Sequence, residues 1–200
     1  MNVISLTDID LEDFKAYCRK YRYEHDDSYL YEEDMEDFEP HSGKHPTYLL
    51  IKDEKIIGVL SLMLDGYFVA NKKTRIRMFH CETGNRLHYQ MLLDALEPLP
   101  EHIETMEMFL PDKLVDVQAM VESMGFNYYR TSFVMVRKNQ PAPVVDFPQG
   151  YTLESLLPGV DETAYAHIRN TAFKTLKGSE APMSIELVRK LTLDPNILKN

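Results

Sequence analysis

Apolar positions follow two different periods along the first two thirds of the chain, and together they predict strands alternating with helices. Residues 47–64 hold two nearly continuous apolar runs, separated by the polar turn of residues 52–55. This pattern predicts a β-hairpin, and because neither run alternates with polar residues, both faces of the hairpin are expected to be covered. Gly58 interrupts the second run, which indicates either a β-bulge or a close approach of another part of the chain.

Residues 74–96 predict a strand that feeds a helix through a short turn. Residues 75–81 have the apolar and β-branched content of a strand, and residues 82–85 supply turn formers and helix-start residues. One face of the following helix carries the apolar side chains Leu87, Met91, Leu92, Ala95 and Leu96. Such a turn presents free backbone N–H groups at the positive end of the helix dipole, which is a favourable position for a phosphate group.

Shorter patterns complete the order of elements up to residue 138. The expected elements are a strand at residues 1–6, a helix with Leu11, Phe14 and Cys18 on one face, a strand at residues 103–110, a helix at residues 112–124 that ends at Gly125, and one or two closing strands at residues 127–137.

A proline-rich linker is predicted at residues 139–149, and the pattern of the N-terminus then returns. Residues 151–156 are strand-like, a helix capped by Asp161 runs to Phe173, and residues 184–191 predict another helix. This is a weak internal repeat, carried by the order of elements. A strand–helix–helix piece buries little core alone, so we expect it to pack on the first domain, to pair with another chain, or to begin a longer protein.

Composition places the chain among soluble globular proteins. Of the 200 residues, 44% are hydrophobic and 27% are charged, and the longest apolar run, residues 56–64, is too short to span a bilayer. The N-terminus lacks the layout of a signal peptide, so a cytoplasmic protein without membrane contact is expected, with Cys18 and Cys81 as free thiols. The net charge of −10 argues against nucleic-acid binding and permits a cationic substrate, although solubility alone explains the same charge.

An acidic, aromatic segment at residues 21–40 allows two interpretations. It carries nine acidic residues from Glu24 to Glu39 with tyrosines between them. Either this is a solvated acidic face anchored by its aromatic rings, or it is a wall of a cleft that selects an amine. The loop that follows contains His41 and His45, but its glycine and flanking prolines make a poor ligand frame, so no metal site is predicted.

The element order resembles that of the GCN5-related N-acetyltransferase (GNAT) family. Two stretches carry the likeness: residues 74–96, and residues 114–126, LVDVQAMVESMGF, which end in a Gly-Phe pair. The resemblance implies an α/β (α+β) fold with a mixed, mostly antiparallel central sheet flanked by helices. It also implies a GNAT-like domain at residues 1–138, the linker at 139–149, and at residues 150–200 the opening strand–helix–helix of a second repeat, as in tandem GNAT proteins.

The same resemblance implies acetyl-CoA as the cofactor and indicates where it would lie. The backbone of the turn, Glu82, Thr83, Gly84, Asn85 and Arg86, would hold the pyrophosphate, while Met78, Phe79, His80 and Cys81 would run beside the pantetheine arm. The candidate proton carriers are His80, Glu107 and Tyr128. Each also has a structural interpretation: a hydrogen-bonded histidine at a strand end, a solvent-facing strand residue, and a core residue of a closing strand, respectively.

Departures from the family pattern keep two functions open. The turn has one glycine, Gly84, at the family's basic position, and Leu87 and Tyr89 are expected to crowd a phosphate where the family has small residues. Val121 stands where the family commonly has a tyrosine acid. The chain is therefore either an N-acetyltransferase acting on an amine-bearing small molecule, or a non-catalytic GNAT-fold half that supports an active half beyond residue 200. A binding domain for a cationic metabolite, using residues 24–39, and a homo-oligomer formed through the C-terminal segment are further possibilities.

Overall fold

The computed structural model divides the chain into two units, Met1–Tyr128 and Tyr129–Asn200. The residues that the structure describes are 1–7, 10–25, 35–36, 38–40, 43, 45–64, 66–133, 144, 146–179 and 181–193. Among the helices of these residues, none has the length and apolar character that a membrane crossing requires. The predicted domain boundary near residue 138 lies outside the described residues, and the second repeat remains a prediction.

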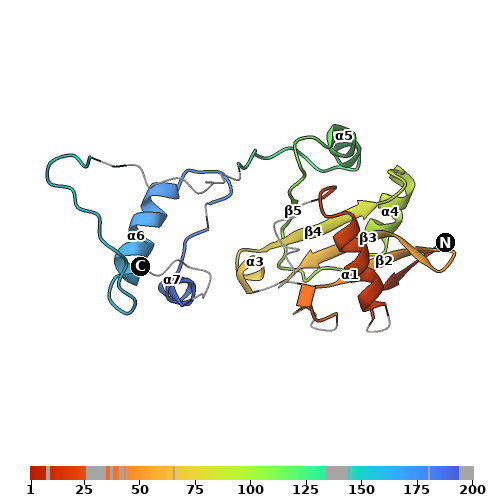
Figure 1. The fold of residues 1–200 in the computed structure, drawn as a ribbon, viewed down its shortest axis with the longest axis horizontal. Helices are drawn as coiled ribbons and strands as arrows, with labels where there is room; N and C mark the ends of the chain where they lie inside the picture. The colour runs from red at the N-terminus through yellow and green to blue at the C-terminus, as the bar shows by residue number, and fades with distance from the viewer. Residues whose placement is uncertain are drawn as a thin grey trace. The chain divides into compact units, whose positions relative to one another are not determined.

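A five-stranded sheet forms the centre of the N-terminal unit (Figure 1). Its strands, in both chain order and sheet order, are β1 (Asn2–Ser5), β2 (Thr47–Lys52), β3 (Lys55–Met63), β4 (Lys73–Cys81) and β5 (Thr105–Met108). The pairs β1–β2, β2–β3 and β3–β4 are antiparallel, and β5 lies parallel to β4. The helices of this unit are α1 (Leu11–Lys20), α3 (Gly66–Ala70), α4 (Arg86–Asp94) and α5 (Val115–Ser123). The predicted fold class, a mostly antiparallel mixed sheet flanked by helices, is confirmed.

Both faces of the β2–β3 hairpin are buried, as its unbroken apolar runs predicted. One face meets α1, where Leu49 and Val59 share a core cluster with Phe14. The other face meets α4 and α5, where Leu60 packs in a cluster that contains Leu92. A strand that is buried on both faces carries apolar side chains on both, so its sequence does not alternate between apolar and polar residues.

A β-bulge at Arg77 changes which side chains of β4 face each layer. Ser61 of β3 pairs with Met78, but the next residue of β3, Leu62, pairs with Ile76, so Arg77 has no counterpart on β3. Beyond the bulge the alternation of faces is therefore shifted by one residue. As a result, the Met78 side chain lies in the core beneath α1. His80, two residues further along β4, faces the same side of the sheet and contacts Tyr17 of α1.

Gly58 of β3 lies where another part of the chain comes close. It pairs with Leu50 next to a register shift, and a Cβ atom added at Gly58 would lie 2.7 Å from the Cys81 sulfur and 3.3 Å from the His80 carbonyl oxygen. Both expectations for this glycine, a neighbouring bulge and a close approach, are therefore confirmed. Burial of Cys81 against Gly58 leaves no room for a side chain at that position.

The Gly58→Ala variant is expected to lower the free energy of unfolding by about 1–3 kcal/mol, because the new methyl group overpacks the contact with Cys81. Urea denaturation of the full chain measures this loss. In a Cys81→Ala background the nearest atom is gone, so the same glycine substitution should cost less. Equal losses in the two backgrounds would show that the sulfur contact is not the cause.

Two sequence predictions are wrong for the residues that the structure describes. The described residues of the predicted closing strands, 127–133, form no strand, and their exposed aromatic side chains Tyr128 and Phe133 supply no buried face to hold one. On α4 the apolar stripe was expected to include Leu87, which is 66% exposed. The buried face is instead set by Tyr89 and Leu92, and Leu87 lies about 200° round the helix from Tyr89.

The described residues of the C-terminal unit form two helices, α6 (Glu162–Phe173) and α7 (Ile185–Thr192), close to the predicted bounds. They pack against each other, and the Asn170 side chain bonds both the N–H and the carbonyl of Met183 on the connection between them. Ser184 caps α7 by accepting from the Leu187 amide. The predicted strand at residues 151–156 is absent from this described stretch, because a strand needs a neighbour with which to pair.

Candidate functional site

The candidate site lies at the C-terminal end of β4, where this strand has left β5. Pairing between the two strands runs from Lys73 with Thr105 to Ile76 with Met108. Strand β4 then continues to Cys81, and in the described part of the chain this second half has a sheet partner on the β3 side alone. The end of the β5 pairing coincides with the bulge at Arg77, which explains why the strands part there.

His80 is the centre of a buried polar cluster at this end of β4. Only 4% of the residue is exposed, and its Nδ1 atom lies 2.8 Å from the Tyr17 hydroxyl. Its Nε2 atom lies 3.2 Å from a carboxylate oxygen of Glu24. The Tyr21 ring stacks on the imidazole with a centroid distance of 4.5 Å. We call His80, Tyr17, Tyr21 and Glu24 the His80 cluster.

Helix α1 and the turn that follows it bring these groups to β4. Phe14, Tyr17 and Cys18 are spaced by three and four residues, so they share the helix face that packs on the sheet. Tyr21 lies one helical turn beyond Tyr17, at the C-cap of α1. The bulge at Arg77 turns His80 toward the same layer, so the cluster depends on two elements far apart in the chain.

The protonation states of the cluster follow from burial. Burial raises the pKa of Tyr17 far above its ordinary value, so its hydroxyl keeps its proton and donates to Nδ1 of His80. Burial also lowers the pKa of His80, and the Glu24 carboxylate partly opposes this effect. His80 is therefore neutral at pH 7, with its proton on Nε2, where it can donate to Glu24.

A second carboxylate, Glu82, lies beside the cluster at the start of the turn. It accepts hydrogen bonds from the Tyr21 hydroxyl and from the Lys20 ammonium group, the latter at 3.1 Å. The Tyr21 hydrogen bond is the main cause of the lowered pKa of Glu82. Because Lys20 is exposed, the ion pair contributes little to stability.

The turn before α4 satisfies most of its own backbone amides. Asn85 caps the helix by accepting from the Leu87 amide at 2.9 Å. Five of the seven amides of residues 82–88 donate to acceptors inside the protein, those of Glu82, Gly84, Asn85, Leu87 and His88. Within the described residues, the amides of Thr83 and Arg86 are the two of this stretch with no acceptor. A phosphate at this turn would therefore meet fewer free donors than the sequence predicted.

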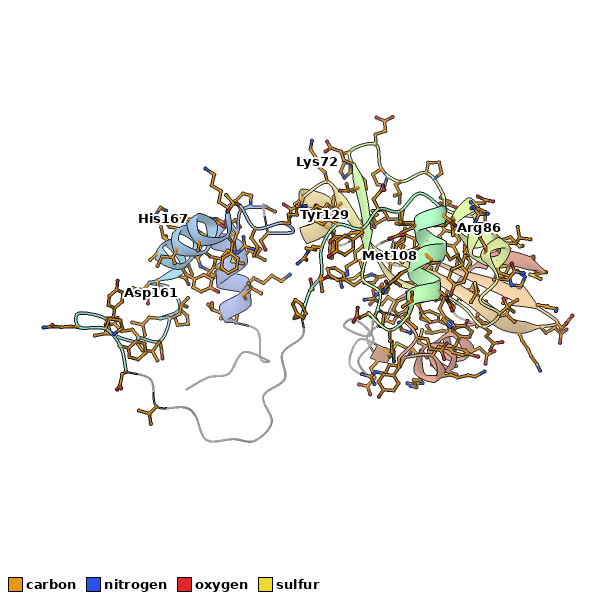
Figure 2. All side chains as sticks on the ribbon, turned by 90° about the horizontal axis from the view of Figure 1, so that it is seen from above. Lys72, Arg86, Met108, Tyr129, Asp161 and His167 are labelled. Atoms are coloured by element: carbon orange, nitrogen blue, oxygen red, sulfur yellow. The ribbon has the colours of Figure 1, made fainter. Side chains whose placement is uncertain are left out.

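Arg86 supplies a positive charge at the same helix terminus. It is the first residue of α4, and its side chain reaches toward α5, where Nε donates to the Ser123 hydroxyl at 3.3 Å (Figure 2). The bulky residues that were expected to crowd the turn do not enter it: Leu87 is exposed to solvent and Tyr89 points into the core against Phe79. A phosphate would therefore meet Arg86 without a steric block from either side chain.

The three predicted proton carriers are not brought together. His80 is in the cluster, whereas Glu107 is opposite Arg75, five residues back along β4, or about 16 Å at the usual rise per residue. The Glu107 carboxylate lies 3.8 Å from the Lys73 ammonium group. Tyr128 is 73% exposed at the end of the N-terminal unit. The roles proposed for these residues remain predictions.

The predicted pantetheine-contacting residues have side chains that belong to the core. Met78 packs beneath α1, Phe79 packs on the opposite face, and Cys81 packs against Gly58. Burial raises the pKa of the Cys81 thiol to about 12, so this sulfur is not a ready nucleophile. Contacts from this half of β4 to a ligand would therefore come from its backbone.

Tyr17 was not among the predicted site residues. The signal was its position three residues after Phe14 on the buried stripe of α1, because a buried tyrosine hydroxyl needs a hydrogen-bond partner. Glu24 and Tyr21 were noted as parts of the acidic segment, but nothing in the local pattern indicated that they contact His80. In the described part of the chain, no group of three His, Cys, Asp or Glu side chains is arranged to hold a metal ion.

Comparisons with known proteins give two similar structures. No family model and no curated protein matches the chain. One solved structure, described as a probable acetyltransferase, is 19% identical and covers 74% of this chain and 100% of its own, with a TM-score of 0.46. A probable acetyltransferase from Staphylococcus epidermidis ATCC 12228 is 13% identical and covers 62% of this chain and 82% of its own, with a TM-score of 0.45.

Proposed function

We propose that this protein is an acyl-CoA-dependent N-acetyltransferase that acts on an amine-bearing small molecule, with acetyl-CoA as the donor. The observation that carries the proposal is the separation of β4 from β5 after Ile76, beside a buried neutral imidazole at His80. Acetyl transfer to an amine needs an extended acyl donor held in place and a group that takes a proton from the attacking nitrogen.

The second half of β4 is suited to hold the donor's pantetheine arm. That arm contains amide groups, and a strand edge without a sheet partner offers backbone N–H and C=O groups at matching spacing. Because the side chains of Met78 and Phe79 are in the core, this contact would rely on main-chain hydrogen bonds. The thioester would then lie near the end of β4, close to the His80 cluster.

The phosphate end of the donor would lie at the N-terminus of α4. The free amides of Thr83 and Arg86, the Arg86 side chain and the positive end of the helix dipole all favour negative charge there. The exposed position of Leu87 in the first turn of α4 provides a direct way to test it.

The alternative function is a non-catalytic GNAT-fold module. The capping of α4 by Asn85 and the internal use of five amides favour it, because they leave few donors for a pyrophosphate. The burial of Val121, where a proton-donating tyrosine was expected by resemblance, favours it as well. The two functions differ in one measurable property, the binding of acetyl-CoA.

The Leu87→Glu variant is expected to bind acetyl-CoA more weakly while the fold becomes no less stable. A negative charge in the first turn favours the α4 dipole by about 0.3–1 kcal/mol, but it repels a nearby pyrophosphate by at least about 1 kcal/mol, or roughly fivefold in Kd. Calorimetric titration and thermal unfolding measure the two effects.

Leu87→Gln is the matched control, since it has the same shape without the charge and should bind acetyl-CoA like the wild type. Equal affinity in the Glu and Gln variants would place the phosphate elsewhere. A wild-type protein that shows no binding at millimolar acetyl-CoA would rule out the acetyltransferase and support the non-catalytic module.

A further inference from the structure

We propose that Tyr17, His80 and Glu24 form a proton relay in which the Tyr17 hydroxyl, rather than the imidazole, takes the proton from the substrate ammonium group. The inference rests on the proposed function and adds to it the identity of the group that meets the acceptor amine. Tyr17 is then the catalytic residue, His80 stores the proton, and Glu24 is a positioning residue.

The three side chains are connected in one continuous chain of hydrogen bonds. The Tyr17 hydroxyl lies 2.8 Å from Nδ1 of His80, and Nε2 on the other side of the ring lies 3.2 Å from Glu24. A hydroxyl, an imidazole and a carboxylate in this order form the arrangement in which a histidine draws a proton from a hydroxyl while the carboxylate stabilises the imidazolium. Here the hydroxyl belongs to a tyrosine on α1.

Both nitrogen atoms of His80 are already engaged, so neutral His80 has no lone pair for a substrate. Its Nδ1 lone pair accepts from Tyr17, and its Nε2 proton is directed at Glu24. The Tyr21 ring also covers one face of the imidazole. The Tyr17 oxygen still has lone pairs after it donates its proton, so at the buried end of the chain the hydroxyl, and not the imidazole, can accept another proton.

The Tyr17 hydroxyl lies at the end of β4 where the thioester is proposed to lie. Its partner His80 directly precedes Cys81, and Tyr21, whose ring stacks on His80, donates a hydrogen bond to Glu82, so Cys81 and Glu82 lie at the same end of the strand. These are the last residue of β4 and the first residue of the turn. An acceptor amine that attacks a thioester at this strand end would approach the same hydroxyl.

The proton steps balance without another reactant. The substrate ammonium gives one proton to the Tyr17 oxygen as the hydroxyl proton of Tyr17 moves to Nδ1 of His80. The resulting amine forms the C–N bond with the thioester carbonyl carbon, and the C–S bond breaks. A second proton passes from the attacking nitrogen to the leaving thiolate, which gives the amide and free CoA.

Glu24 gives the stored proton a way out of the protein. Its side chain is 59% exposed, whereas His80 is buried, so the carboxylate connects the imidazolium to water. Glu24 also holds the ring in the tautomer that leaves Nδ1 open to Tyr17. Among the described residues, the titratable groups that face His80 are Tyr17 of α1, Tyr21, Glu24 and His25 of the segment after α1, and Glu82 after β4.

The relay is tested on the full chain by measuring thiol release from acetyl-CoA with spermidine and a panel of primary amines. Tyr17→Phe should lower kcat by 100-fold or more with little change in the KM for acetyl-CoA. Tyr23→Phe is the matched control, because Tyr23 is exposed and has no part in the cluster, and it should keep the wild-type kcat.

Glu24→Gln gives a readout that a merely structural residue would not change. Because Glu24 raises the pKa of His80, its removal should shift the acid limb of the kcat–pH profile to lower pH, and Glu24→Asp should restore the limb in part. Nitrogen-15 NMR of the wild type should show the Nε2–H tautomer of His80 with no substrate present.

Each outcome bears on the relay. Full activity of Tyr17→Phe, an unmoved acid limb in Glu24→Gln, or an Nδ1–H tautomer in the wild type would overturn the relay while leaving the acetyltransferase intact. If acetyl-CoA binds but no amine of the panel is turned over, the tautomer of His80 in the wild type decides whether the relay stands. Absence of acetyl-CoA binding would overturn both the relay and the proposed function.

Discussion

Replacement of Tyr89 by alanine is expected to lower the free energy of unfolding of the N-terminal unit by about 3–5 kcal/mol, the range for removing a large aromatic ring from a core. Tyr89 is 1% exposed and packs edge-on against Phe79 with a centroid distance of 4.8 Å. The ring anchors the first turns of α4 to the sheet, so its loss leaves a cavity between the helix and β4. Hydrogen exchange of the β3 and β4 amides measures the loss in this unit directly.

Two further variants separate the causes of this loss. Tyr89→Phe keeps the ring and should cost only about 0.5–1.5 kcal/mol, the net contribution of the hydrogen bond between the Tyr89 oxygen and the Cys81 backbone. Leu87→Ala, at an exposed position two residues away, should stay within about 0.5 kcal/mol of the wild type. If Tyr89→Ala cost no more than Leu87→Ala, the packing of α4 would not depend on this ring.

Because Tyr89 also fixes the direction of α4, the alanine variant should weaken acetyl-CoA binding. The Arg86 side chain and the two free amides lie at the start of the same helix, and their position follows the helix axis. Loss of stability with unchanged affinity would show that the phosphate contacts do not depend on α4.

Replacement of His80 by alanine is expected to reduce kcat by about 10²–10⁴-fold, the contribution typical of general base catalysis. The same change leaves the Tyr17 hydroxyl buried without its partner, which should cost about 1–3 kcal/mol of stability. Acetyl-CoA affinity should remain close to the wild-type value, because the proposed donor contacts in this part of β4 are made by the backbone. Steady-state kinetics, calorimetry and urea denaturation measure the three quantities.

His88→Ala is the control for this variant. His88 is on the solvent side of α4, where its Nδ1 atom bonds the Thr83 hydroxyl at 2.6 Å, and it has no contact with the His80 cluster. It should keep the wild-type kcat. A His80→Ala enzyme as active as His88→Ala would show that His80 is a structural histidine at a strand end.

Parts of the site could be predicted from the sequence where one stretch of chain carries the whole signal. The strand, turn and helix of residues 74–96 appear as β4 and α4, and Asn85 is the N-cap. The direction of individual side chains could not be predicted so well. The bulge at Arg77 shifts the alternation along β4, and an inserted residue has no signature in the apolar pattern.

The sequence by itself determined α1, α4, α5, α6, α7 and the hairpin, because these follow from local periodicity and from turn and cap residues, but not the short helix α3. The class of fold was indicated by the order of these elements. Only the tertiary structure decided the chemistry at the end of β4. Tyr17 and Glu24 reach His80 across more than fifty residues of chain, and their hydrogen bonds exist because α1 packs on the layer into which the bulge turns His80. The same structure showed that the turn before α4 bonds most of its own amides, since side-chain caps such as Asn85 compete with a ligand for backbone donors.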